Sequence, residues 1–135
     1  MVKKIYWGKP MWKSMHFVAL KYPQNPTTED KMNYMTYYKS IGNVLPCPPC
    51  RNHYKKMLEE YPMTEEVMMN NDTLFAWTVL LHNKVNQRLG KKVYTVEEAK
   101  KLYTHPQRKM CIWVIWVVVI LILIGYIIKQ KCKKK

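Results

Sequence analysis

The stretch that decides the fold is Leu45-Pro46-Cys47-Pro48-Pro49-Cys50-Arg51-Asn52-His53, in which two prolines separate two cysteines. Proline suits the first turn of a helix, because the N–H groups there have no partner within the helix. We therefore expect a helix that begins near Cys47, where unpaired N–H groups and the helix dipole favour a thiolate. Apolar residues then recur with a helical period up to Tyr61-Pro62: Tyr54, Met57, Leu58 and Tyr61. A dithiol at the start of a rigid helix indicates redox chemistry.

Other chemistries fit the two cysteines less well. A zinc site could use Cys47, Cys50, His53 and a further histidine, but zinc ribbons and fingers usually bring a second closely spaced ligand pair, which this chain lacks. A c-type haem needs histidine directly after the second cysteine, where this sequence has Arg51. A thioredoxin-like domain needs βαβ flanks, whereas the neighbouring segments have helical patterns. A purely structural disulfide across four residues would remove little chain entropy.

Length and charge set further bounds. The 135 residues have room for one small domain, and the net charge is +14, with five lysines in residues 129–135. A basic domain suits an anionic ligand such as a nucleotide, an anionic lipid or nucleic acid, although a solvated surface explains the charge equally well. Four cysteines are too few for a disulfide scaffold, and Cys111 and Cys132 stand alone. Residues 1–12 lack the apolar segment of a secretory signal.

Two helices are predicted before the cysteine pair. The first starts near Lys9-Pro10, with Pro10 in its first turn, and the Tyr22-Pro23 turn stops it. One face of it carries Trp12, Met15, His16, Ala19 and Leu20. Thr27 caps the second, with Asp30 three residues later, and Gly42-Asn43 ends it. Its inward-facing residues are expected to be Met32, Met35, Tyr38 and Ile41.

Two more helices follow. The fourth runs from about Asp72 to Leu89, capped by Asn71 or Asp72, and Gly90 ends it. Its apolar stripe is Leu74, Trp77, Leu81 and Val85, and a second face carries His82, Asn83 and Asn86. Those polar groups could bind a heteroaromatic ring or a ribose, or simply face solvent. Thr95-Val96-Glu97-Glu98 predicts a capping box for a short fifth helix to about Tyr103. The fold class is therefore all-α, a helical bundle.

Residues 111–128 form an uncharged run of 18 residues. As a helix it would be about 27 Å long, close to the thickness of a bilayer core. Trp113, Trp116 and Tyr126 lie near its ends, as is usual at membrane interfaces. A buried core helix is the alternative, but the preceding segments already supply a complete domain. The expected organisation is a domain at 1–106, a linker at 107–110, a transmembrane helix at 111–128 and a lysine-rich tail at 129–135.

Taken together, these residues resemble the Erv/ALR family of FAD-linked sulfhydryl oxidases, especially its short viral members. The resemblance covers about Trp7 to Tyr103. It is carried by Trp7-Gly8 with Trp12 and His16, the Tyr22-Pro23 turn, Cys47-Pro48-Pro49-Cys50, Trp77 leading into His82-Asn83-Lys84-Val85-Asn86, Leu89-Gly90-Lys91 and Tyr94. The cysteine pair alone is weakly specific, whereas the pair followed by these later motifs is strongly so.

The resemblance implies a four-helix bundle with a short fifth helix, holding FAD in the bundle mouth, usually as a homodimer. Cys50 would lie against the flavin ring and Cys47 would face the substrate. No metal is expected. The residues expected to contact FAD are Gly8, Trp12, His16, His53, Trp77, His82, Asn83, Asn86, Lys91 and Tyr94. Aromatic rings can sandwich planar groups, and Lys91 would supply charge for the pyrophosphate.

The implied reaction is the formation of disulfides in protein dithiols, with electrons passing through Cys47, Cys50 and FAD to oxygen, which is released as hydrogen peroxide. The chain departs from fuller members of the family. It has no cysteine near His82 or Tyr94 for their additional structural disulfide, and no second cysteine pair as a shuttle. A separate protein dithiol, or a thioredoxin-like relay protein, is therefore the expected reductant. No nucleic acid partner is expected.

The apolar run lies at the C-terminal end, which predicts a tail anchor with the redox domain on the cytosolic face. The positive charges flanking the run are nearly balanced, four on one side and five on the other, so they do not decide orientation. A disulfide-forming enzyme in a reducing cytosol fits a large DNA virus that oxidises its own proteins there. We therefore expect a single-pass protein of an intracellular or virion membrane. The rival interpretation is a non-catalytic, basic, membrane-anchored binding module with a Cys/His zinc site.

Overall fold

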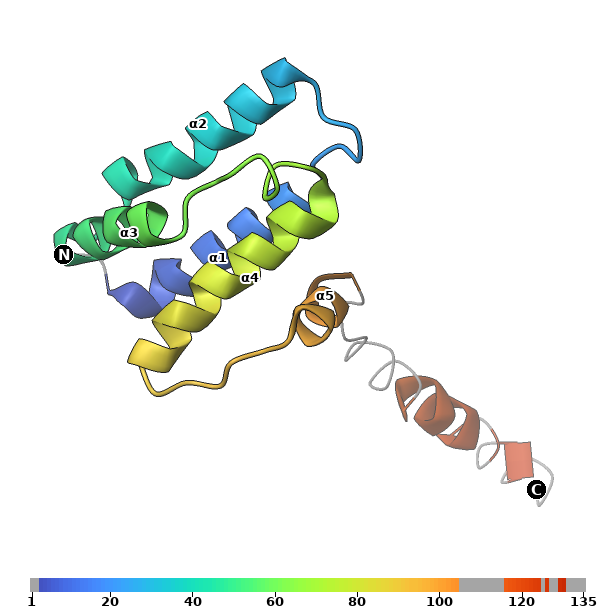
Figure 1. Ribbon diagram of the computed structural model, residues 1–135. Coiled ribbons are helices and arrows are strands. Elements are labelled where there is room, and N and C mark those ends of the chain that lie inside the picture. The colour runs from blue at the N-terminus through green and yellow to red at the C-terminus, as the bar shows by residue number, and fades with distance from the viewer. Residues whose placement is uncertain (1–2, 105–115, 125, 127–128, 131–135) are drawn as a thin grey trace. The chain divides into compact units, whose positions relative to one another are not determined.

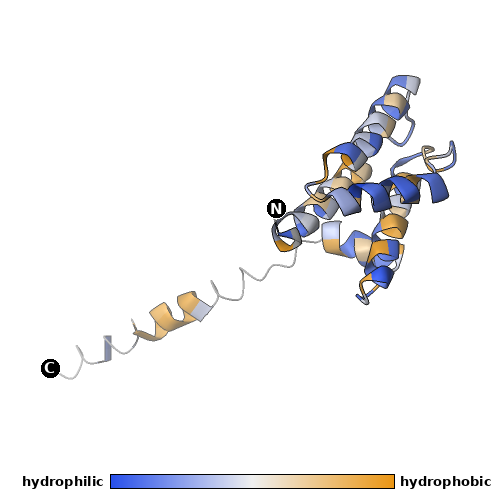
Figure 2. Cartoon of the chain, turned by 90° about the vertical axis from the view of Figure 1, so that its left-hand side faces the viewer, coloured by the Kyte–Doolittle hydropathy of each residue, from blue (hydrophilic) through white to orange (hydrophobic). Residues whose placement is uncertain are grey.

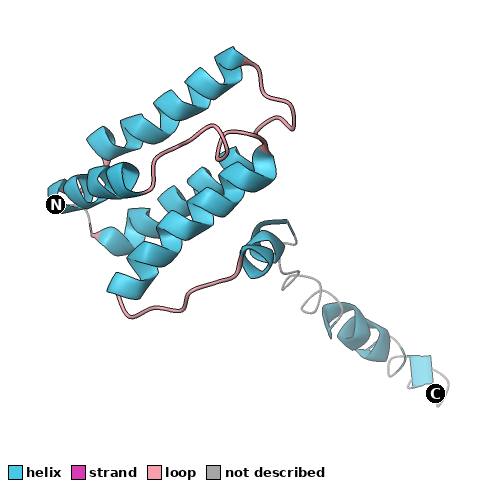
Figure 3. Ribbon diagram, viewed as in Figure 1, coloured by secondary structure: helices cyan, strands magenta, loops and turns pink. Residues whose placement is uncertain are grey.

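The computed structural model describes residues 3–104, 116–124, 126 and 129–130. Within residues 3–104 the chain forms helices and no strand (Figure 3). The helices are α1 Lys4–Leu20, α2 Thr28–Val44, α3 Pro48–Glu60, α4 Asn71–Arg88 and α5 Val96–Thr104 (Figure 1). The chain divides into two compact units, Met1–Thr104 and His105–Lys135. The prediction of an all-α domain with four helices and a short fifth is confirmed.

The helices pack in pairs. Helix α1 lies against α4, and α2 lies against α3, while the short α5 contacts both α1 and α4 (Figure 1). The apolar faces of the helices meet in one core, whose buried members include Met15, Ala19, Ile41, Leu74 and Leu81. The inward faces predicted for α1 and α4 are therefore confirmed.

Buried tyrosine hydroxyls tie the pairs together. Tyr38 on α2 donates to the carbonyl of Met15 on α1 at 2.8 Å, and Tyr54 on α3 donates to the carbonyl of Tyr38 at 3.0 Å. Burial raises the pKa of both hydroxyls, so they remain protonated donors. Because each hydroxyl crosses from one helix to the next, these bonds fix how α1, α2 and α3 are set against one another.

Local capping sets most helix starts. Thr27 accepts a hydrogen bond from the Asp30 N–H at 3.1 Å, and the Asp30 carboxylate accepts from the Thr27 N–H at 2.9 Å, so the predicted cap of α2 is confirmed. The same reciprocal pair links Thr95 and Glu98 before α5. The cap of α4 is Asn70, one residue before the predicted positions, because its side chain accepts from two N–H groups of the first turn.

Helix α4 ends in a tight left-handed turn at Gly90, whose φ is 62°. The Gly90 N–H donates to the Gln87 carbonyl at 3.1 Å, and the Lys91 N–H donates to the Asn86 carbonyl at 2.8 Å. This pair of bonds is the Schellman arrangement, which favours glycine at the left-handed position. The turn confirms the predicted end of the helix and directs the chain back along α4.

Three further details of the helix predictions were wrong, the first being the end of α2, which runs on to Val44 past the expected stop at Gly42-Asn43. Helix α1 begins at Lys4, so Pro10 lies inside it rather than in its first turn. Proline there removes one helical hydrogen bond, but the preceding turn carries Trp7, which packs against the core, and this burial favours the longer helix. Met32 was expected to face inward but is 62% exposed. The buried stripe of α2 instead passes through Tyr34 and Tyr38.

The C-terminal unit is described only in part. Residues 116–124 are helical and their large apolar side chains are mostly exposed; Figure 2 colours this helix as mostly hydrophobic. Among the described residues, no helix combines the length and hydropathy needed to cross a membrane. The predicted span at 111–128 includes residues outside the described ones, as does the tail at 129–135, and the linker at 107–110 lies wholly outside them.

Candidate functional site

Cys47 and Cys50 form a disulfide at the start of α3, with their Cα atoms 5.1 Å apart. Cys47 is the N-cap residue, and Pro48 and Pro49 occupy the first two helical positions, as predicted. The N–H groups of Cys50 and Arg51 both donate to the Cys47 carbonyl, at 2.9 and 3.1 Å. The local sequence therefore places the cysteine pair where the positive end of the helix dipole would stabilise a thiolate.

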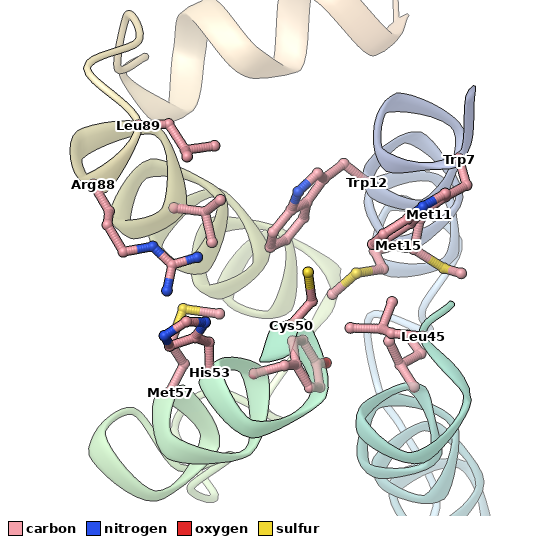
Figure 4. Close-up of a pocket in the computed structure, with 13 residues that line it drawn as sticks. Trp7, Met11, Trp12, Met15, Leu45, Cys50, His53, Met57, Arg88 and Leu89 are labelled. Carbon is pink, nitrogen blue, oxygen red and sulfur yellow. The ribbon is translucent and has the colours of Figure 1, made fainter. Parts of the chain in front are cut away.

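The two sulfurs differ in their surroundings. Cys50 borders a cavity of about 120 Å³, and Figure 4 shows its sulfur projecting from α3 towards the space that Trp12 borders. Cys47 is only 4% exposed. We expected Cys47 to face the substrate, and in this structure little of the residue is open to solvent.

The cavity beside Cys50 is mostly apolar and is walled by residues of α1 to α4. Its lining residues are Trp7, Met11, Trp12, Met15, Ile41, Leu45, Cys50, His53, Tyr54, Met57, Val85, Arg88 and Leu89. The indole N–H of Trp7 is buried and has no hydrogen-bond partner in the described part of the chain. A buried donor left unpaired is unusual, and a ligand with an acceptor group would satisfy it. Trp7 belongs to the family-like Trp7-Gly8 motif but was not among the expected contact residues.

A second cavity, of about 150 Å³, is lined by four of the predicted FAD contacts: His16, His82, Asn83 and Tyr94. Its remaining wall comes from Val79 on α4 and from Ala99, Leu102 and Tyr103 on α5. Trp12 borders the first cavity, and its ring stacks on His82 of the second with centroids 4.3 Å apart and planes 5° apart. The stacked pair links the two cavities into one aromatic region.

Both histidines of this region are neutral near neutral pH. Burial, and then the neighbouring His82, lower the pKa of His16 to about 3. Burial, and then the charge of Lys91, lower the pKa of His82 to about 4. His16 lies between Thr78 and His82. Its Nδ1 is 2.8 Å from the Thr78 hydroxyl, and its Nε2 is 3.0 Å from His82 Nδ1. Neutral stacked rings of this kind can contact a planar aromatic ligand.

The asparagines hold the segment that follows α4. The Asn83 side chain donates to the Tyr94 carbonyl at 2.7 Å and accepts from the Tyr94 N–H at 3.0 Å. Asn86 is buried, and its carbonyl accepts the N–H of Lys91. Asn83 therefore uses both ends of its amide to position Tyr94, and the Lys91 side chain is exposed, with its charge acting on His82.

A sequence model of the Erv1 / Alr family matches residues 9–104. This chain belongs to the Erv1/Alr family. Among its relatives, a protein of Acanthamoeba polyphaga mimivirus named probable FAD-linked sulfhydryl oxidase is 47% identical over 93 residues, which are 69% of this chain and 65% of that protein. The FAD-linked sulfhydryl oxidase of African swine fever virus is 30% identical over 99 residues, which are 73% of this chain and 81% of the viral protein.

Solved structures of the Erv1/Alr family share the fold. The FAD-binding domain of Erv1 from Saccharomyces cerevisiae matches with a TM-score of 0.71 at 24% identity, over 76% of this chain and 95% of the yeast domain. The yeast Erv1 core matches with the same TM-score over 78% of this chain and 87% of the core. The family resemblance inferred from the sequence motifs is confirmed.

Four of the expected contact residues line neither of these two cavities: Gly8, Trp77, Asn86 and Lys91. Trp77 is buried in the core, donates its indole N–H to the Tyr61 carbonyl at 2.9 Å and packs edge-on against Tyr38. Its remaining surface borders a shallow groove with Val67 and Leu80, away from Cys50. Gly8 lies on α1, and a Cβ placed there would meet nothing within 4 Å. His53, by contrast, lines the cavity with Cys50.

The rival zinc interpretation finds no support in the described residues. Cys47 and Cys50 are joined to each other. Within the part of the chain that the structure describes, no group of three or more His, Cys, Asp or Glu side chains is placed to hold a metal ion.

Proposed function

We propose that this protein is an FAD-dependent sulfhydryl oxidase that forms disulfides in protein dithiols. The observation that carries the proposal is the Cys47–Cys50 disulfide at the start of α3, with Cys50 on the wall of an aromatic cavity. The names of the viral relatives, both FAD-linked sulfhydryl oxidases, support the same activity.

The residues present fit FAD. The cavity beside Cys50 offers aromatic and apolar walls and the indole N–H of Trp7, which has no partner among the described residues and suits a polar acceptor on a planar ring. The adjoining region offers the stacked pair of Trp12 and His82. FAD would be held by Trp12, His16, His53, His82, Asn83, Asn86, Lys91 and Tyr94. When bound, the flavin supplies a two-electron acceptor for the reduced cysteine pair and passes the electrons to oxygen, giving hydrogen peroxide.

The protein's own steps are thiol–disulfide exchanges. A substrate thiolate attacks the Cys47 sulfur, a mixed disulfide forms, and Cys50 leaves as a thiolate, which the N-terminus of α3 stabilises. The second thiolate of the substrate then attacks the substrate sulfur that is bonded to Cys47. The oxidised substrate is released, and Cys47 leaves as a thiolate. Two electrons have moved from the substrate to the cysteine pair, and the reduced Cys50 lies beside the cofactor cavity.

Oxygen consumption with dithiothreitol tests this proposal on the full-length protein. We expect the wild type to consume oxygen and produce peroxide, and Cys50→Ser to bind FAD but lose turnover. Cys132→Ser is the matched control, because the proposal gives that cysteine no part in the reaction, and it should retain wild-type turnover. Full activity in Cys50→Ser would refute the assignment.

The natural partners follow from the same chemistry. The chain lacks a second closely spaced cysteine pair, so its reductant would be a separate protein dithiol or a thioredoxin-like relay protein. A homodimer and a role in maturing viral proteins follow from the family resemblance and from the viral sources of the two relatives described above. The mass of a mixed disulfide trapped on Cys50→Ser would identify the substrate.

The uncharged run at residues 111–128 supports a C-terminal membrane anchor, with the redox domain on the cytosolic side. Protease treatment of intact microsomes carrying the full-length protein tests this orientation. We expect digestion of the domain without detergent, and a protected domain would show the opposite orientation.

A further inference from the structure

A continuous chain of hydrogen bonds runs from the backbone of α4 to the cofactor region. The Thr78 hydroxyl is fully buried and lies 2.7 Å from the Phe75 carbonyl and 2.8 Å from His16 Nδ1. His16 Nε2 in turn lies 3.0 Å from His82 Nδ1. We call Thr78, His16 and His82 the histidine chain. It spans α1 and α4, and its last ring stacks on Trp12.

The direction of these bonds is set at Thr78. A hydroxyl has one proton, and two oxygens at 2.7 Å with no proton between them would repel each other. The Thr78 proton therefore points to the Phe75 carbonyl, as is common for threonine within a helix. The Thr78 oxygen is then an acceptor, so His16 must carry its proton on Nδ1.

The same reasoning decides which ring nitrogen of His82 carries its proton. Burial keeps His16 neutral, so its Nε2 has no proton and must accept. The proton between the two rings therefore belongs to His82 Nδ1, and because burial keeps His82 neutral too, its Nε2 is a bare acceptor. No group in the described part of the chain hydrogen-bonds to that nitrogen, while the ring itself borders the cavity that contains Asn83 and Tyr94.

We propose that Thr78 is a positioning residue that fixes the ring tautomers of His16 and His82, so that His82 offers Nε2 as an acceptor to a hydrogen-bond donor on the cofactor. The donor would be an amine, a ring N–H or a hydroxyl. This inference depends on the proposed function for the identity of the ligand, but the tautomers of the two rings do not depend on it. Thr78 itself touches only Phe75 and His16 within the chain of bonds.

Long-range proton–nitrogen NMR spectra of full-length protein with ¹⁵N-labelled histidine test the proposal. In the wild type we expect both His16 and His82 in the Nδ1–H tautomer. Thr78→Ser keeps the hydroxyl and should preserve both tautomers. Thr78→Val keeps the shape but removes the acceptor, so His16 should shift its proton to Nε2 and drive His82 to the Nε2–H tautomer.

FAD titration of the same three proteins gives the second readout. We expect Thr78→Val to bind FAD about tenfold more weakly, the cost of one mismatched hydrogen bond, and Thr78→Ser to bind as the wild type does. An Nε2–H tautomer on either ring of the wild type, or unchanged tautomers in Thr78→Val, would overturn the proposal. Switched tautomers with unchanged FAD affinity would overturn the ligand role of His82. A wild type that binds no FAD would instead refute the proposed function.

Discussion

Acidification should destabilise the fold well above the pH at which its carboxylates are protonated. The perturbation is a change from about pH 7.5 to about pH 5.5, which crosses the ordinary histidine pKa near 6.5. In the folded chain burial lowers the pKa of His16 to about 3 and that of His82 to about 4. The unfolded chain therefore takes up protons in this range and the folded chain does not, so stability is complete above pH 6.5 and falls below it.

The magnitude follows from the proton balance. One histidine that is protonated only when unfolded loses about 1.4 kcal/mol of stability between these two pH values. His16 is almost fully buried and should contribute nearly that amount. His82 is only half-buried, so solvent screens part of its contribution. Together they predict a loss of about 2 kcal/mol. Asp30 and Glu98 also have lowered pKa values, but their contributions are lost only at more acidic pH.

Urea unfolding of the flavin-free, full-length protein, followed by tryptophan fluorescence, measures this loss at the two pH values. We expect the His16→Gln variant to be less stable overall but to lose only about one third as much stability on acidification. His53→Gln, at an exposed position on α3, is the control and should keep the wild-type difference. A urea midpoint that does not change with pH would refute the reasoning. So would a His16→Gln variant that loses as much stability on acidification as the wild type does.

Three substitutions test the fold around the site by urea unfolding. Asn83→Ala removes both hydrogen bonds to the Tyr94 backbone and should cost about 2 kcal/mol, with faster amide exchange at Tyr94. Gly90→Ala forces a side chain into the left-handed region and should cost about 1 kcal/mol. Tyr38→Phe removes the buried bond to the Met15 carbonyl and should cost about 1 kcal/mol.

Each of these three has an outcome that would contradict it. Unchanged amide exchange in Asn83→Ala would mean that the side chain does not hold the segment after α4. Gly90→Asn should be milder than Gly90→Ala, and the reverse order would argue against a left-handed turn. Tyr34→Phe loses only a long contact of 3.4 Å and serves as the control for Tyr38→Phe; equal losses would show no role for the buried hydroxyl.

The sequence predicted the helices well where their signals are local. Thr27 with Asp30, and Thr95 with Glu98, cap helices through residues three positions apart, so the spacing alone identifies them. Pro10 misled the prediction because the local penalty of proline is outweighed by the tertiary packing of Trp7, which no local rule contains.

The site was predictable from motifs but its connections were not. Cys50, His53, His16 and His82 line the two cavities, and their contact with FAD stays a prediction. Trp77 lines neither cavity, because its ring lies in the core, where the indole N–H donates to the Tyr61 carbonyl. The contact between His16 and Thr78 joins residues 62 positions apart, and only the packing of α1 on α4 reveals it.

The most direct test of the central claim is the reduction of bound flavin without oxygen. Full-length wild-type protein should purify yellow, and its visible flavin absorbance should bleach when a stoichiometric amount of dithiothreitol is added anaerobically. Cys50→Ser should also be yellow but should bleach far more slowly, because the sulfur that borders the aromatic cavity is gone. A colourless wild-type protein, or a Cys50→Ser variant reduced as fast as the wild type, would contradict the account.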